Sequence, residues 1–132
     1  MNPTTIDVPG LPPANTTYSQ VSILGDLVFV SGQVGIDPAT GRLADGGIQA
    51  QTRHAIESID RCLAAAGASL DKVAKVNLYV ADFGNPAQGD QGRLLSLRAE
   101  LLPALPPGGS ASADDRHRDL PHRLSLCETR KQ

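Results

Sequence analysis

The chain has few aromatic residues: two Tyr, two Phe and no Trp among 132 residues. Positive charge is not in excess either, because 14 acidic side chains outnumber 12 Lys and Arg. A nucleic-acid surface combines a basic patch with aromatic stacking platforms, so this composition argues against nucleic-acid binding. No apolar run approaches the ~20 residues of a membrane span. We therefore expect a soluble globular protein of one domain with a modest core.

Cysteine is equally scarce. Cys62 falls on a predicted helix and Cys127 near the C-terminus, and neither belongs to a CxxC motif. Because this spacing gives no disulfide or zinc framework, we expect two reduced thiols and a cytoplasmic location. The first ten residues, MNPTTIDVPG, contain no basic region and no apolar core, so we expect that the protein is not exported.

Residues 18–33 predict a β-hairpin. After a first alternating strand, Gly25-Asp26 supplies the turn, and the apolar run Leu27–Val30 is typical of a strand covered on both faces. Ser31-Gly32-Gln33 then ends this strand with a hydroxyl, a bare backbone and an amide, from which a binding site can be built. On local sequence alone, a simple turn is the commoner explanation of such a polar strand end.

A long amphipathic helix is the clearest predicted element, from Ile48 to Ala66. Its apolar stripe, which recurs every three or four residues, consists of Ile48, Thr52, Ala55, Ile56, Ile59, Cys62, Leu63 and Ala66. Gly67 is predicted to end the helix. His54 lies off the stripe and has no partner at metal-ligand spacing, so we expect a solvated side chain there.

Three further elements are predicted. Thr5–Val8 forms a short edge strand, and Val73–Val80 alternates apolar and polar residues as a half-buried strand does. Pro86–Leu102 forms a second helix, whose start is weakened by glycine. The order strand, strand, helix, strand, helix requires one last strand to complete a split β-α-β pattern.

Valine and isoleucine are absent from the whole sequence after Val80. Because strands favour β-branched and aromatic residues, residues 103–132 predict no last strand and have the composition of a disordered segment. We therefore divide the chain into a domain over 1–102 and an atypical tail over 103–132. A shifted reading frame is a second explanation of the tail: with common codons, a shift of one nucleotide turns residues 114–122 into an alternating strand of Thr, Ile and Val.

Several blocks of sequence, in their order and spacing, resemble one known family. They are YSQ from Tyr18, LVFVSGQ from Leu27, DPATG from Asp37, GGIQAQTRHAIESID from Gly46 and AAGASLDKVAKVNLYVADF ending at Phe83. Together they cover roughly residues 15–85. They resemble the RidA (YjgF) family of reactive-intermediate enamine/imine deaminases.

The resemblance implies an α+β fold of the chorismate-mutase-like type, with the element order β-β-α-β-α-β. It also implies a homotrimer with a ligand cleft between neighbouring subunits. The implied activity is that of a hydrolase, a 2-iminobutanoate/2-iminopropanoate deaminase, which converts reactive 2-imino acids to 2-keto acids and ammonia without a metal or a cofactor. The expected partners are therefore small imino or keto acids and further copies of the chain, and neither nucleic acid nor a membrane.

The site residues that the family uses are only partly present. By the resemblance, Tyr18, Ser31 and Gly32 line the substrate-binding cleft, and Asp90 stands where the family has an asparagine. The arginine that binds the substrate carboxylate, in a Pro-Ala-Arg-Ser segment, is missing, because residues 107–110 read Pro-Gly-Gly-Ser. No tail residue stands in the sequence context of the glutamate that positions water on the family's last strand. No catalytic residue is therefore assigned.

Two classes of function are open. The first is an imine deaminase of low activity, because the loss of one buried charge pair typically costs a few kcal/mol. The second is a trimer of the same fold that binds small metabolites without turnover. A metal site in the tail, built from His117, His122, Asp114 and Asp115, is disfavoured because charged residues and prolines there are typical of a solvated segment. A missing last strand would also leave an unpaired sheet edge that favours aggregation.

Overall fold

The computed structural model describes residues 1–12, 17–79 and 123–130. Its elements are β1 (Thr4–Ile6), β2 (Val21–Leu24), β3 (Leu27–Val34), β4 (Ile36–Asp37), β5 (Arg42–Leu43), α1 (Gly47–Ala65), a 3-10 helix (Leu70–Lys72), β6 (Val76–Tyr79) and β7 (Arg123–Arg130). The predicted second helix, Pro86–Leu102, lies outside the described residues.

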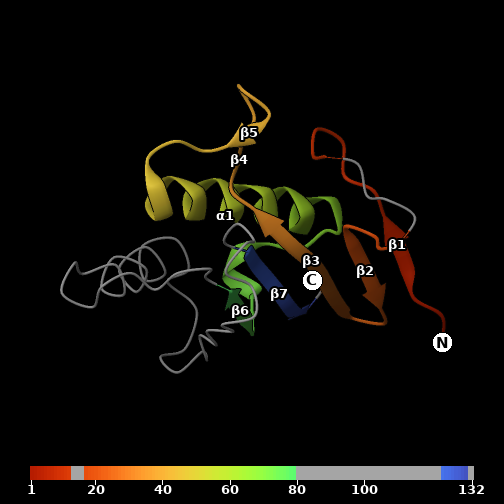
Figure 1. Cartoon of the computed structure of the whole chain (residues 1–132). Helices are drawn as coiled ribbons and strands as arrows, with labels where there is room; N and C mark the ends of the chain where they lie inside the picture. Colours follow the sequence, from red (N-terminus) through yellow and green to blue (C-terminus); the bar gives the residue numbers. More distant parts are fainter. Residues whose placement is uncertain (13–16, 80–122, 131–132) are drawn as a thin grey trace.

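Five of these strands form one antiparallel sheet in the order β1-β2-β3-β7-β6 (Figure 1). Helix α1 lies across one face of the sheet and packs mainly against β3. Among the described strands, β4 and β5 pair only with each other, in a hairpin between β3 and the helix. This arrangement confirms the predicted α+β fold class.

The predicted hairpin is present, with Gly25 at a φ of +60° in its turn. Two details of the prediction are wrong. The second strand continues through Ser31-Gly32-Gln33 to Val34, because pairing with β7 extends it. In the single chain, this strand is also buried on one face and not on both. Val28 and Val30 are buried, whereas Leu27 and Phe29 on the other face are partly exposed.

The core lies between α1 and the sheet. Its buried residues are Val8, Val21, Val28, Val30, Ala55, Ile56, Ile59, Cys62, Leu63, Ala66 and Val73. The predicted stripe of the helix therefore supplies much of this core, as its spacing required. Gly67, at a φ of +71°, ends the helix with its N–H donating to the Ala64 carbonyl oxygen, which confirms the predicted stop.

The expectation that residues 103–132 hold no strand is wrong for Arg123–Arg130. This segment is β7, and it lies in the sheet between β3 and β6. A strand in the centre of a sheet gains hydrogen bonds along both edges, and strand preference depends strongly on such context, so the lack of Val and Ile does not prevent it. The boundary after residue 102 and the hypothesis of a shifted reading frame stay predictions.

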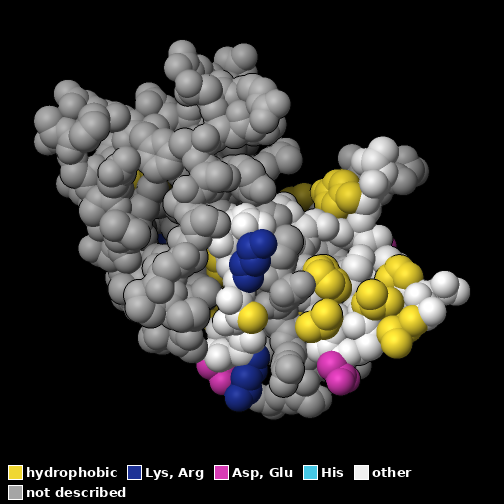
Figure 2. Space-filling view, turned by 90° about the horizontal axis from the view of Figure 1, so that it is seen from below, with side chains coloured by type: hydrophobic (Ala, Val, Ile, Leu, Met, Phe, Trp, Pro, Cys, Tyr) yellow, Lys and Arg dark blue, Asp and Glu magenta, His cyan; other side chains and the backbone are white. Residues whose placement is uncertain are grey.

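The face of the sheet turned away from α1 carries an apolar strip. The register pairs Leu24 with Leu27 and Ser22 with Phe29, so these four side chains share that face. None of the four is buried. Figure 2, which views the molecule from below the sheet, shows hydrophobic side chains gathered on this side with few charged ones among them.

Candidate functional site

A β-bulge interrupts β3 at the predicted Ser-Gly position. The register pairs Val30 with Leu126 and Gln33 with Leu124, which leaves Ser31 and Gly32 together opposite the single residue Ser125. Such bulges are common beside active sites, because they bend the strand and redirect its side chains. Ser31-Gly32 is therefore neither a turn nor a strand end but a local distortion inside a central strand.

Hydrogen bonds hold Ser31 in the bulge. Its N–H donates to the Gln20 carbonyl oxygen at 2.9 Å, and its hydroxyl donates to the Ser19 carbonyl oxygen. Its own carbonyl oxygen accepts a hydrogen bond from the Gln33 side-chain Nε2 at 3.1 Å. The Ser31 side chain thus fixes the segment that precedes β2.

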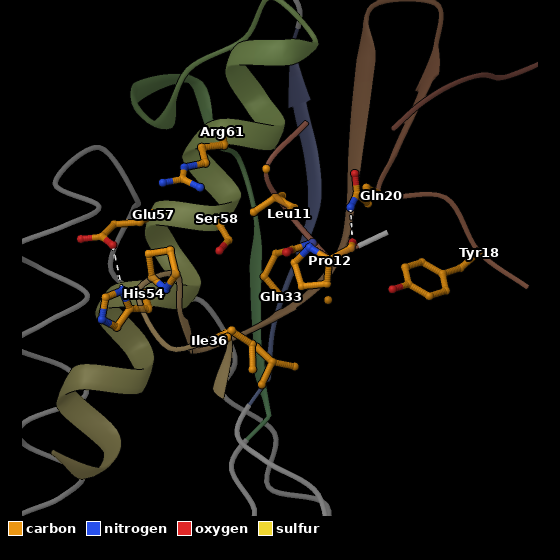
Figure 3. A pocket seen from close by; sticks show the side chains of 15 residues that line it. Leu11, Pro12, Tyr18, Gln20, Gln33, Ile36, His54, Glu57, Ser58 and Arg61 are labelled. Carbon is orange, nitrogen blue, oxygen red and sulfur yellow. Dashed lines mark hydrogen bonds and ion pairs between the residues drawn. The ribbon is translucent and has the colours of Figure 1, made fainter. Parts of the chain in front are cut away.

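A cavity of about 450 Å³ opens beside Gly32 (Figure 3). Among its lining residues are Tyr18 and Gly32, so the structure brings two of the predicted site residues to one space. Tyr18 is 48% exposed, and its hydroxyl points toward the cavity. Ser31 does not line this cavity, and Asp90 lies outside the described residues.

Buried glutamines build the cavity wall between the N-terminal arm (residues 1–12) and the sheet. Gln20 is buried; its Oε1 accepts a hydrogen bond from the Val8 N–H, and its Nε2 donates to the Pro12 carbonyl oxygen at 2.6 Å. This side chain ties the arm to β2 and so shapes one edge of the cavity. The sequence offered no signal for it, because a glutamine before a strand is unremarkable until its partners are known.

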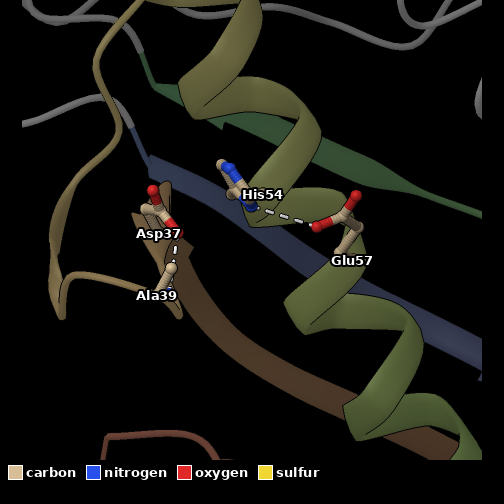
Figure 4. A network of polar contacts seen from close by, with 4 residues as sticks. All are labelled: Asp37, Ala39, His54 and Glu57. Carbon is tan, nitrogen blue, oxygen red and sulfur yellow. Dashed lines mark hydrogen bonds and ion pairs between the residues drawn. The ribbon is translucent and has the colours of Figure 1, made fainter.

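Helix α1 supplies the opposite wall through His54, Glu57, Ser58 and Arg61. His54 Nδ1 lies 3.0 Å from Glu57 Oε2, and the two side chains are 26% and 55% exposed (Figure 4). The prediction of a solvated His54 needs correction: the imidazole is only partly exposed, has a carboxylate partner and lines the cavity. The i,i+3 spacing of histidine and glutamate was the available signal.

No cluster of three or more potential metal ligands occurs within residues 1–12, 17–79 and 123–130. Cys62 is fully buried, and burial raises the pKa of its thiol to about 11, so it is unsuited to act as a nucleophile. None of the described helices is long and apolar enough to cross a bilayer.

The register of β7 shows which of its residues lie level with the bulge at Ser31-Gly32. Its register places Ser125 opposite the bulge, and the β6 pairing places Asn77 beside Ser125. Glu128, the only glutamate after Glu100, falls three residues further along, where the register shifts again near Val28. Within the described strands, no glutamate therefore stands level with Ser31-Gly32.

Together these features define a class of protein: a small α+β domain in which a helix covers an antiparallel sheet and a ligand-sized cavity lies beside a bulged central strand. A family model described as Endoribonuclease L-PSP matches residues 10–91, which is more than half of the sequence. The chain belongs to this family, which is the RidA/YjgF family, and the resemblance is confirmed.

Individual relatives agree with this membership. A RutC family protein of Pyrococcus abyssi is 45% identical over 71 residues, which are 54% of this chain and 56% of the relative, so the chain matches little more than half the length of such relatives. The 2-iminobutanoate/2-iminopropanoate deaminase of Rattus norvegicus is 32% identical over 104 residues, covering 74% of this chain and 76% of that protein. The crystal structure of RidA from an Antarctic Psychrobacter has a TM-score of 0.74 and 29% identity, covering 96% of this chain and 98% of that one.

Proposed function

We propose that the chain is an imine deaminase that hydrolyses 2-imino acids to 2-keto acids and ammonia, with an activity below that of its relatives. The observation that carries this proposal is the similarity to the rat 2-iminobutanoate/2-iminopropanoate deaminase over 74% of the chain. The cavity beside Tyr18 and Gly32 supports it, because an imino acid needs a site that is partly enclosed and close to polar groups.

The reaction makes modest demands on a protein. The carbon of an iminium group is already electrophilic, so much of the acceleration can come from positioning one water and the substrate carboxylate. Gly32 has no side chain, which allows a ligand to approach the backbone of β3 closely. The bulge at Ser31-Gly32 is thus suited to form the floor of the site.

Two altered positions are the reason for proposing a low activity. Residues 108 and 109 are glycines where the family segment has Ala-Arg, so the guanidinium that would bind the carboxylate in two hydrogen bonds is missing. On β7, no glutamate stands level with the bulge, so a carboxylate that could accept a proton from water is missing there among the described strands.

The apolar strip on the outer face of β2 and β3 supports a homotrimer. Leu24, Leu27 and Phe29 share this face without being buried in the single chain. Self-association through the face would remove them from water, at about 25 cal/mol per Å² of apolar surface. We place this trimer in the cytoplasm, in keeping with the scarcity of cysteine.

The activity is tested with 2-aminoacrylate generated from serine by a serine dehydratase, or with imino acids generated by an amino-acid oxidase. We expect imine hydrolysis that depends on the protein and is lost in Gly32→Val, whose side chain would fill the cavity floor. Leu43→Ala, on the exposed β5 strand, is the control and should retain the activity. Turnover at the same rate in Gly32→Val would contradict the proposed location of the site.

A second candidate is a trimer that binds small metabolites without turnover. The observation that favours it is the absence of a glutamate level with the bulge in the described strands. Thermal stabilisation by 2-keto acids, with no release of ammonia from imino acids, would select this function over deamination.

A further inference from the structure

The cavity beside Gly32 has two walls of different chemistry (Figure 3). One side, formed by the arm, the end of β3 and the β4–β5 hairpin, is largely apolar, with the polar groups of Tyr18, Gln20 and Gln33 set among Leu11, Pro12, Val34, Ile36 and Pro38. The other side is the polar wall that α1 supplies. A ligand that fits both walls has an apolar body and a polar or charged end.

The two charged side chains of the helix wall, Glu57 and Arg61, do not pair with each other. Glu57 stands four residues before Arg61, a spacing at which ion pairs form on helices, yet its Oε2 is 3.0 Å from His54 Nδ1 instead. Within the described residues, Arg61 has no ion-pair partner. A guanidinium keeps its positive charge throughout the physiological pH range, so this wall presents a cation that none of the described carboxylates pairs with.

The arm leaves this cation open to the cavity. Gly10 has a φ of +82°, and a Cβ atom built on it would lie 3.9 Å from Arg61 Nη1. The backbone therefore passes close to the guanidinium without a side chain that could cover it or pair with it. The positive φ of Gly10 changes the direction of the arm just before Leu11 and Pro12. Glycine adopts this conformation without strain.

We propose that this cavity binds an organic monocarboxylate with a branched apolar body, and that Arg61 binds its carboxylate. The volume of about 450 Å³ lies within the usual range of small-molecule pockets and exceeds what a three- or four-carbon acid fills. This inference deepens the proposed function, on which it rests for the 2-keto or 2-imino group of the ligand. It assigns the substrate class as the bulkier members of that series and names a cation that no sequence motif indicated.

The test is titration calorimetry with two probes, 4-methyl-2-oxopentanoate and 2-oxobutanoate. The larger acid has two more carbon atoms to bury, so we expect it to bind about tenfold more tightly to the unmodified protein. Arg61→Gln should weaken the binding of both acids by about tenfold, because a charge-assisted hydrogen bond is lost. Lys75→Gln removes the same charge at an exposed residue that does not line the cavity, and it should bind both acids unchanged.

A second variant tests the access that Gly10 provides. Asparagine tolerates positive φ better than other residues with a side chain, so Gly10→Asn should keep the fold while its amide occupies the space beside the guanidinium. We expect an unchanged melting temperature and binding weakened to the level of Arg61→Gln. Full affinity in Gly10→Asn would contradict the proposed position of the carboxylate.

The outcomes separate this inference from the proposed function. Equal affinity in the unmodified protein and Arg61→Gln, or no binding of either acid, would overturn the inference. If imino acids are nevertheless hydrolysed with an unchanged KM in Arg61→Gln, the deaminase proposal stands and Arg61 has no part in it. If both acids bind through Arg61 and no ammonia is released, the inference stands and the deaminase proposal fails.

Discussion

Gly35 and Gln51 bring the sheet and the helix into direct backbone contact. A Cβ atom on Gly35 would overlap the carbonyl oxygen and the Cα of Gln51 in α1. Since neither partner is the end of a flexible side chain, an added methyl group can be accommodated only if the helix moves away from the end of β3. This contact fixes how closely α1 approaches the end of β3, and both elements line the cavity.

We predict that Gly35→Ala destabilises the protein by about 1–3 kcal/mol, the usual cost of overpacking a tight contact. Gly41→Ala is the comparison: Gly41 has a φ of +68° but nothing within 4 Å of its Cβ position, so only backbone strain of about 1 kcal/mol is added there. Urea unfolding followed by circular dichroism measures both. A Gly35→Ala variant as stable as the unmodified protein would contradict the contact.

We predict that Gln20→Leu loosens the N-terminal arm. The variant leaves the Val8 N–H and the Pro12 carbonyl oxygen without their side-chain partner, at a cost of about 1–3 kcal/mol for the buried Val8 N–H and less for the exposed Pro12. Hydrogen exchange at Val8 should accelerate by a factor of at least ten. Gln49→Leu, an exposed change on α1, is the matched control and should leave the exchange at Val8 as it was.

We predict that Cys62 makes the protein less stable at alkaline pH. Burial raises the pKa of this thiol from 9.0 to about 11. Between these two values the unfolded chain has lost the proton that the folded chain retains, so the free energy of unfolding falls as pH rises, by at most about 2–3 kcal/mol.

Urea unfolding at pH 8 and at pH 10.5 checks the effect of Cys62. Cys62→Ala should lose stability at both pH values through its smaller side chain, but it should show a shallower decline between them. Equal declines in the two proteins would show that the thiol does not contribute.

We predict that the chain sediments as a trimer and that Phe29→Glu disperses it. Phe29 lies on the outer face of the sheet beside Ser22, where a buried carboxylate would be unpaired in an association interface. Leu43→Glu places the same charge on the exposed β5 strand and should leave the trimer intact. A monomer in the unmodified protein would contradict the role proposed for the apolar strip.

The features that depend on nearby sequence were predictable. The three- and four-residue spacing from Thr52 to Leu63 gave the buried face of α1, and Gly67 gave its end. Gly25-Asp26 gave the hairpin turn, because that turn needs positive φ. These signals are local, so one sequence suffices to find them.

The features that depend on pairing were not predictable. The bulge at Ser31-Gly32 exists only because the β3–β7 register places two residues opposite Ser125, some ninety residues away in the chain. The strand β7 itself was missed for the same reason, since its place between β3 and β6 outweighs its composition. Gln20 and Arg61 belong to the site because the arm lies close to both of them in the folded chain, and no local sequence signal indicates this contact.

We have proposed that this member of the family has a deaminase site weakened because the arginine of the family segment is missing. The most direct measurement compares imine hydrolysis by the unmodified protein, Gly109→Arg and Gly108→Arg. By the resemblance, Gly109 stands at the arginine position of the family segment, and Gly108 is its neighbour. We expect Gly109→Arg to raise the rate at least tenfold, because it returns the guanidinium that the family directs at the carboxylate, whereas Gly108→Arg should not. A high rate in the unmodified protein that Gly109→Arg leaves unchanged would contradict the account.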